Sequence, residues 1–412
     1  MEQNSLSMRN ELLCRPLSLQ SFFVLIFSET ICSWLSNGML MVSLGWWAID
    51  TKYRFFGSSL IESCFFIPPL LFGFWFGKLS DEQQPTHLAQ QGTLLKLFIT
   101  AILIFYQQYY EVSFVALSAY CLVVALGDTI VDPSITGYIG KVLRDREFAK
   151  FIAARPLLID FSFMLGGLVV APIYKWIGIK GVLGFILGFY FFANCVVFLL
   201  PKLQLTHPKS KNIQDDEVHQ EVSAKISWVP LILFCLIVLL FGTVLIFFLF
   251  YSNHFMKEGI QFVSYLHGAF ITGLAIAMLV IWKNPLPNNF GRKSMFGHLV
   301  VCLFLPLLFF GKTIWILPLI VFAVIGYVEG WIFMCLERLW IAQHPINLRG
   351  HASGQLFSFS TATRIIGLYS LGVLANYSTV KIVILFLMVY LLALTIYSWF
   401  QIEKINNLPS IG

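Results

Sequence analysis

The chain has 412 residues, of which 58% are hydrophobic and 12% charged, and its mean hydropathy is +0.80. This balance excludes an ordinary soluble domain, in which about 25% of residues are charged. The formal net charge of +6 does not indicate nucleic-acid binding, because the basic residues lie between long apolar segments.

Apolar runs of roughly 20 residues, the length that crosses a bilayer as an α-helix, recur along the whole chain. The polar N-terminal stretch from Met1 to Leu19 has no cleavage site and leads into the first run, so we expect no signal peptide. We predict twelve transmembrane helices: Leu19–Ala48, Gly57–Leu79, Thr93–Tyr110, Ser113–Ile139, Phe148–Ile173, Gly181–Leu200, Trp228–Tyr251, Phe262–Trp282, Ser294–Phe310, Trp315–Ile341, Ser353–Ala375 and Lys381–Phe400.

One polar linker interrupts this pattern. We therefore expect an all-α membrane protein with an N-terminal six-helix bundle (1–200), a cytoplasmic linker (201–227) and a C-terminal six-helix bundle (228–412). Placing both termini in the cytoplasm puts most of the loop lysines and arginines inside, as the positive-inside rule requires. Short loops without targeting signals suit a bacterial inner membrane, and we expect a monomer.

Polar residues recur on one face of the first predicted span. Glu29, Ser33, Ser36 and Asn37 are separated by helical spacings. One interpretation is a cavity-lining face, with Glu29 as a proton site and Ser33 and Asn37 near the substrate. The alternative is a stripe that holds helices together by hydrogen bonds.

The fourth and fifth spans form a hairpin that contains four charged residues. Counted from the turn near Leu143, Asp132 and Arg155 lie at similar depth, which predicts a structural ion pair. Asp128 and Asp160 also share a depth. Two carboxylates in one dry site cannot both ionise easily, so they are candidates for proton coupling, unless they point to different faces.

The second half carries its own charged groups inside the spans. Glu329 and Arg364 lie at similar depth and could pair; alternatively, Arg364 faces the cavity and attracts an anionic group. His267 is a further candidate for the cavity, and Glu337 is a candidate for gating. Glu62 lies in the outer third of the second span and receives no role.

Three turns carry motifs. Gly77-Lys-Leu-Ser-Asp81 matches the first half of the loop motif G-x-L-a-D-r-x-G-r-k, and Phe290-Gly-Arg-Lys293 matches its tail. At these turns the chain resembles the major facilitator superfamily, and the Arg349-Gly350 turn looks like that of bacterial drug and siderophore exporters. The resemblance implies two pseudo-symmetric bundles and a cytoplasmic gate at Gly77, Asp81, Arg144, Arg146, Arg349 and Gly350.

A fainter likeness connects the chain to ferroportin-type metal exporters. Where their metal ligands align, this chain has Asn37, Phe248 and Gly367, so we expect no metal site of that type. The chain has no Walker motif and no hydrolase spacing, so we expect neither a cofactor nor an enzyme activity.

These observations predict a secondary transporter that works by alternating access in the lipid bilayer. The expected activity is proton-coupled efflux of an amphipathic small molecule, such as a drug or siderophore. One alternative is uptake of a small polar or anionic solute, or metal export. A different class of alternative is a membrane receptor or scaffold that transports nothing.

Overall fold

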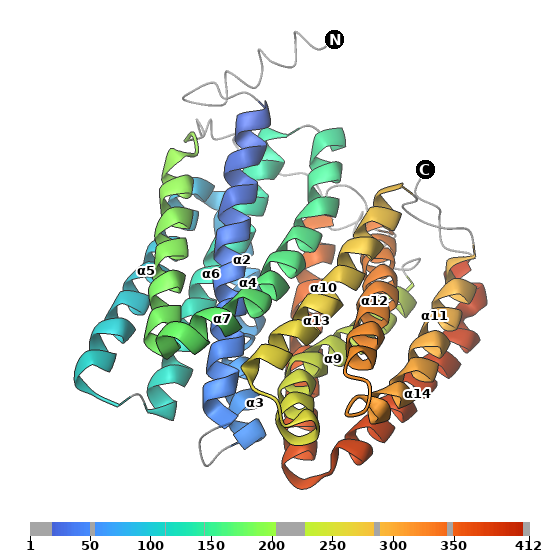
Figure 1. Ribbon diagram of the computed structural model, residues 1–412. Coiled ribbons are helices and arrows are strands. Elements are labelled where there is room, and N and C mark those ends of the chain that lie inside the picture. The colour runs from blue at the N-terminus through green and yellow to red at the C-terminus, as the bar shows by residue number, and fades with distance from the viewer. Residues whose placement is uncertain are drawn as a thin grey trace.

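The structure is a computed structural model that describes residues 19–49, 54–111, 113–143, 145–202, 227–283, 289–343 and 349–406, and all its regular elements in these ranges are helical (Figure 1). The first half of the chain forms α2 (Leu19–Ile49), α3 (Arg54–Cys64), α4 (Ile67–Glu82), α5 (Pro85–Tyr109), α6 (Phe114–Val142) and α7 (Asp145–Leu199). The second half forms α9 (Val229–Phe250), η1 (Tyr251–Met256), α10 (Ile260–Lys283), α11 (Phe290–Phe304), η2 (Leu305–Phe310), α12 (Ile316–Ala342), α13 (Arg349–Tyr377) and α14 (Val380–Asn406).

Ten helical stretches within the described residues are long and apolar enough to cross a membrane, so the chain is a multi-pass integral membrane protein. Helix α13 is not among the ten stretches. The stretch Leu158–Leu199 counts once, although two spans were expected there.

Helix α7 changes direction at Gly178. This residue has φ 64° and ψ −170°, a conformation with positive φ that side chains disfavour and glycine tolerates. The residues before and after it form two helical arms, and Figure 1 shows the second arm turning back toward the end of the molecule at which the first arm begins. The arms coincide with the expected fifth and sixth spans.

The expected second span is divided into two helices. Helix α3 ends at Cys64 and α4 begins at Ile67, with Pro68 near the start of α4. A proline has no N–H and its ring clashes with the carbonyl four residues earlier, so a continuous helix is unfavourable here. The break lies between Glu62 on α3 and Phe66 before α4.

A pair of glycines lets α2 and α7 cross closely. A Cβ on Gly38 would overlap the carbonyl oxygen of Phe163, and one on Gly166 would overlap that of Leu35. Gly38 thus lies against the residue three positions before Gly166, and Gly166 lies against the residue three positions before Gly38. Close approach of backbones through small residues is the usual way that membrane helices associate.

The same arrangement occurs where α9 crosses α13. A Cβ on Gly242 would lie 2.8 Å from the carbonyl oxygen of Arg364, and one on Gly367 would lie 2.5 Å from that of Leu239. The three-residue offsets match those of the α2–α7 crossing. The two crossings thus share the same local geometry, although the sequence around them differs.

Helix α3 of the first half packs against α9 and α13 of the second half. The backbone amides of Phe55 and Phe56 donate hydrogen bonds to Asn376 Oδ1, 3.2 and 3.4 Å long. A Cβ on Gly372 would overlap the hydroxyl of Ser59. We call this contact the α3–α13 seal; it lies at the end of the molecule where α2 ends (Figure 1).

Candidate functional site

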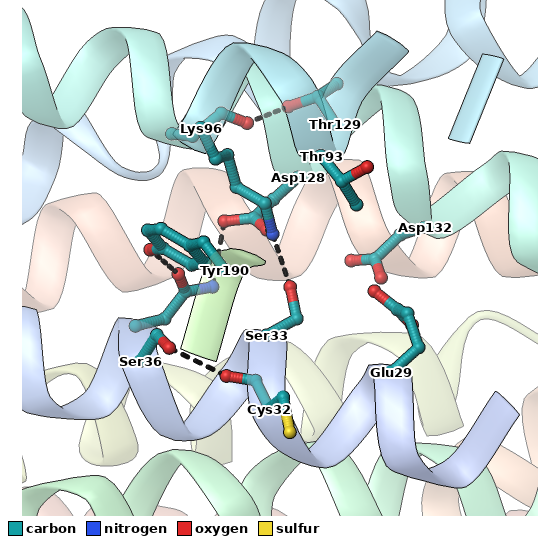
Figure 2. Close-up of polar contacts among 12 residues, drawn as sticks. Glu29, Cys32, Ser33, Ser36, Thr93, Lys96, Asp128, Thr129, Asp132 and Tyr190 are labelled. Atoms are coloured by element: carbon teal, nitrogen blue, oxygen red, sulfur yellow. Dashed lines mark hydrogen bonds and ion pairs between the residues drawn. The ribbon is translucent and has the colours of Figure 1, made fainter. Parts of the chain in front are cut away.

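A buried ion pair joins α5 to α6. Lys96 Nζ lies 2.7 Å from Asp128 Oδ1 and donates a second hydrogen bond to Ser33 Oγ on α2 (Figure 2). Asn37 Nδ2 donates to Asp128 Oδ2 across 2.8 Å, and the Tyr190 hydroxyl donates to Asn37 Oδ1 across 2.7 Å. Lys96 Nζ also lies 4.9 Å from the centre of the Tyr190 ring. Both charges therefore find their partners within the first half of the chain.

Lys96 received no role from the sequence, although it lies within the third predicted span. A lysine among apolar residues is costly unless it is paired, which is the signal that could have identified it. The structure places the cavity candidates Ser33 and Asn37 in contact with this pair.

A second ion pair joins α6 to the first arm of α7. Arg155 Nη2 lies 2.7 Å from Asp132 Oδ1, and Arg155 Nη1 donates a 3.0 Å hydrogen bond to Thr136 Oγ1. The structure thus brings together the two residues that the hairpin spacing placed at one depth.

Glu29 lies between the two pairs and is 1% exposed. The hydroxyl of Thr30 lies 3.4 Å from Oε2, while Oε1 is buried without a hydrogen-bond partner. Figure 2 shows the carboxylates of Glu29 and Asp132 pointing toward one another. The charged groups that act on Glu29 are Lys96, Arg155, Asp132 and Asp128. This group of five contains three carboxylates and two cations, so one negative charge is unbalanced when Glu29 is ionised.

Asp128 and Asp160 do not form the expected carboxylate pair. Asp128 faces Lys96 and Asn37 inside the first half, whereas the charge that acts on Asp160 is that of Arg364. The alternative of side chains on different faces therefore applies, because equal depth along two helices does not place two side chains on facing sides.

Asp160 belongs instead to a group between the two halves of the chain. It lies on α7, within electrostatic range of Arg364 on α13 and of Glu337 on α12. All three side chains are half-buried. The Arg364 guanidinium lies 5.2 Å from the centre of the Phe66 ring. We call Asp160, Glu337 and Arg364 the interfacial triad.

Glu329 does not pair with Arg364. Its Oε1 lies 2.9 Å from His298 Nδ1 on α11, and both side chains are fully buried. His298 Nε2 lies 3.4 Å from Ser294 Oγ. The expected partner was wrong because α11 approaches α12 on the side that Glu329 occupies, while Arg364 faces Phe66.

His267 lies where α10 meets α7. Its Nδ1 is 2.9 Å from the carbonyl of Val263, and Nε2 is buried without a partner. A Cβ on Gly167 would lie 2.8 Å from the imidazole ring. His267 is therefore part of a helix contact between the halves and is not among the residues near the triad.

Glu62 is a buried carboxylate next to the α3–α13 seal. Its Oε1 accepts a 3.0 Å hydrogen bond from Ser58, and its Oε2 is buried without a partner. A Cβ on Gly45 would meet Ser58, Leu249 and Glu62 together, so Glu62 lies where α2, α3 and α9 converge. A carboxylate is costly inside an apolar span, and this cost is the signal in the sequence that could have identified Glu62.

Of the six expected gate residues, Gly77 lies in α4, and its carbonyl accepts a 2.7 Å hydrogen bond from Ser80 Oγ. The other five lie outside the part of the chain whose side chains are described: Asp81, Arg144, Arg146, Arg349 and Gly350. Within the described residues, no three histidine, cysteine or acidic side chains gather as metal ligands would.

An open groove of about 670 Å³ follows the second arm of α7. Its lining residues are apolar or small: Cys32, Gly181, Gly184, Phe185, Gly188, Phe189 and Phe192. The charged groups described above do not line it, so this groove is not the site at which they act.

Solved structures share this fold. A crystal structure of a mutant of the peptide transporter POT in complex with alafosfalin is 13% identical, with a TM-score of 0.72 over 99% of both chains. A D-xylose–proton symporter is 11% identical, with a TM-score of 0.68 over 95% of this chain and 100% of that one. The human organic anion transporter MFSD10 (TETRAN) is 13% identical, with a TM-score of 0.66 over 92% of this chain and 99% of that one.

No curated protein sequence matches the chain. The sequence model of the Major Facilitator Superfamily matches residues 26–367, which is most of its length. The chain therefore belongs to the Major Facilitator Superfamily of membrane transporters.

Proposed function

We propose that this transporter couples the movement of a small organic molecule to protons, and that Glu29 carries the coupling proton. The observation that supports this most is the buried Glu29 carboxylate, with one oxygen lacking any partner, beside two complete ion pairs. A proton on Glu29 would balance the group of three carboxylates and two cations. Charges inside a membrane protein are costly unless balanced, and they mark proton pathways.

The proposed architecture has twelve spans in two six-helix halves, with both termini in the cytoplasm. Counting the two arms of α7 separately and adding α13 to the ten apolar stretches gives this number. The matching glycine crossings of α2 with α7 and of α9 with α13 support two related halves, divided at residues 201–227. The α3–α13 seal would then close the outer side, and the gate turns would close the cytoplasmic side.

The direction is proposed as efflux of an amphipathic drug- or siderophore-like molecule, on the basis of the exporter-like turn at Arg349-Gly350. Import is a second candidate, because one structure with the same fold is that of a D-xylose–proton symporter. We propose a bacterial inner membrane as the location and a monomer as the working unit.

The test is transport by the full chain in proteoliposomes with an entrapped pH-sensitive dye. A pH gradient of either sign is imposed, and sugars, peptides, drugs and siderophores are added in turn. A substrate-dependent proton flux is expected for at least one solute, and its sign gives the direction. If no solute moves protons in either direction, coupling to protons is wrong.

The Glu29→Gln variant then tests the proton site. It should keep exchange of substrate across the membrane and lose accumulation driven by the pH gradient, because glutamine cannot bind and release a proton. Glu111→Gln is the matched control, because Glu111 is an exposed glutamate. Accumulation by Glu29→Gln at the rate of the parent chain would show that the proton binds elsewhere.

A further inference from the structure

The interfacial triad lacks hydrogen-bond partners within the part of the chain that the structure describes. Within the described residues, Asp160, Glu337 and Arg364 form no hydrogen bond and no ion pair within 4.0 Å through their side chains. Their side chains are half-buried. This differs from Lys96 and Arg155, which are each paired with a carboxylate at 2.7 Å.

Phe66 holds the guanidinium of Arg364 without using its hydrogen-bond donors. The cation lies 5.2 Å from the centre of the ring, the range of a cation–π contact. Guanidinium donors lie in the plane of the group and fit a carboxylate or phosphate in a bidentate way. Arg364 is thus positioned and remains free to bind an anionic group.

The two carboxylates determine which anions can bind. Asp160 and Glu337 lie within electrostatic range of one another, Asp160 is within range of Arg364, and Glu337 is within range of Arg338. A molecule with only negative charge would be attracted by the two arginines and repelled by both acids. A molecule with only positive charge would be attracted by both acids and repelled by the two arginines. A neutral molecule would leave all three charges without partners, which is costly in a desolvated site.

We propose that the substrate is dipolar: its carboxylate or phosphate-like group binds Arg364, and its amine binds Asp160, with Glu337 as a second acceptor. This inference rests on the proposed function, since it assigns a substrate class to the same transporter. Asp160 lies in the first half of the chain and Arg364 in the second. A molecule that binds both would connect the halves, and differential binding of this kind can shift the equilibrium between transporter conformations.

The experiment uses the purified full chain and two probes, L-phenylalanine and L-phenylalanyl-L-phenylalanine. Each is offered in three forms: free, with the amine acetylated, and with the carboxylate amidated. Binding is measured by the dependence of thermal stability on probe concentration. We expect at least one free probe to bind about tenfold or more tightly than both of its blocked forms, a difference of about 1.4 kcal/mol for each lost charge contact. Equal binding of free and blocked forms, or no binding of either free probe, overturns the inference.

Variants separate the two ends of the probe. Arg364→Gln should remove the preference for a free carboxylate and keep the preference for a free amine, and Asp160→Asn should do the opposite. Arg364→Lys is the second variant in case Arg364→Gln does not fold; it keeps the charge and loses the bidentate geometry. Lys312→Gln is the matched control, because Lys312 is an exposed cation that lies 4.8 Å from the Phe255 ring, away from the triad. An equal loss of both preferences in all the triad variants would indicate a structural role and overturn the assignment.

Failure of this inference differs from failure of the proposed function. Proton-coupled flux of a neutral sugar, without any preference for the free probes, would overturn the inference of a dipolar substrate and would leave the proposed proton-coupled transport standing. Selective binding of a free probe, without proton flux for any solute, would support the triad as the binding site and would overturn the proposed coupling of transport to protons.

Discussion

Lys96 on α5 and Asp128 on α6 form an ion pair of 2.7 Å in which the lysine side chain is fully buried. Neither residue can be removed alone without leaving the other charge inside the protein. Breaking one partner of a buried pair costs about 3–5 kcal/mol, whereas replacing both partners with well-packed neutral groups can cost little.

The first prediction is therefore a strong coupling between these two residues. Lys96→Met and Asp128→Asn should each lower the free energy of unfolding by about 3–5 kcal/mol. The double variant should be more stable than the sum of the two single losses by at least about 1.5 kcal/mol. The free energy of unfolding is measured in mixed detergent micelles for the parent chain, the two single variants and the double variant. Additive losses would show that the pair contributes no stability.

Lys96 also shows what the sequence could indicate and what it could not. Its position inside an apolar span is a signal, unused in the sequence analysis, that it needs a partner. The choice of Asp128, rather than Glu29 or Asp132, depends on how α5 is rotated against α6. Gly92 and Gly127 set that contact, since a Cβ on Gly127 would lie 2.9 Å from the carbonyl oxygen of Gly92. Hydropathy along the chain contains no direct measure of this rotation.

The second prediction concerns the His298–Glu329 contact. Both side chains are fully buried, and Nδ1 and Oε1 lie 2.9 Å apart. Glu329→Leu leaves His298 Nδ1 without a partner and should lower the free energy of unfolding by about 1–3 kcal/mol. Glu329→Gln keeps an oxygen at the same place and should cost clearly less. If the two variants unfold at the same temperature in one detergent, the hydrogen bond does not stabilise the α11–α12 contact.

The incorrect pairing of Glu329 with Arg364 has the same origin as that of Asp128 with Asp160. Counting residues from a turn gives depth, and it placed Asp132 beside Arg155, which the structure brings together. Depth does not give the direction of a side chain around the helix axis. The family motifs and the apolar runs indicated the fold, whereas the partners of Arg364 and Glu329 required the packing of α11, α12 and α13.

The third prediction tests the repeated glycine crossings. Gly38→Ala should force α2 away from α7, because its Cβ would overlap a backbone oxygen that cannot rotate aside. Gly242→Ala should have a smaller effect, since its Cβ would lie 2.8 Å from the nearest such oxygen. Overpacking typically costs about 1–3 kcal/mol, so both variants should unfold at lower temperature. Gly184→Ala is the control, because nothing lies within 4 Å of its Cβ. A Gly38→Ala chain as stable as the control would contradict the close crossing.

The fourth prediction concerns Asn376 in the α3–α13 seal. Its side-chain oxygen accepts hydrogen bonds from Phe55 and Phe56, two amides at the start of α3 that have no partner within the helix. Asn376→Ala removes this acceptor and should open the seal. Asn376→Asp keeps an oxygen acceptor and places a negative charge near a helix N-terminus, which is favourable, so it should hold the seal closed.

Access to Ser59 measures the opening, because this residue is fully buried beside Gly372. Ser59→Cys is introduced into a chain whose eight native cysteines are replaced by serine or alanine. In nanodiscs, a membrane-impermeant thiol reagent should label it slowly. Adding Asn376→Ala should raise the labelling rate severalfold, and adding Asn376→Asp should not. Fast labelling with Asn376 intact, or equal rates in all three chains, would show that Asn376 does not hold the two halves together at this end.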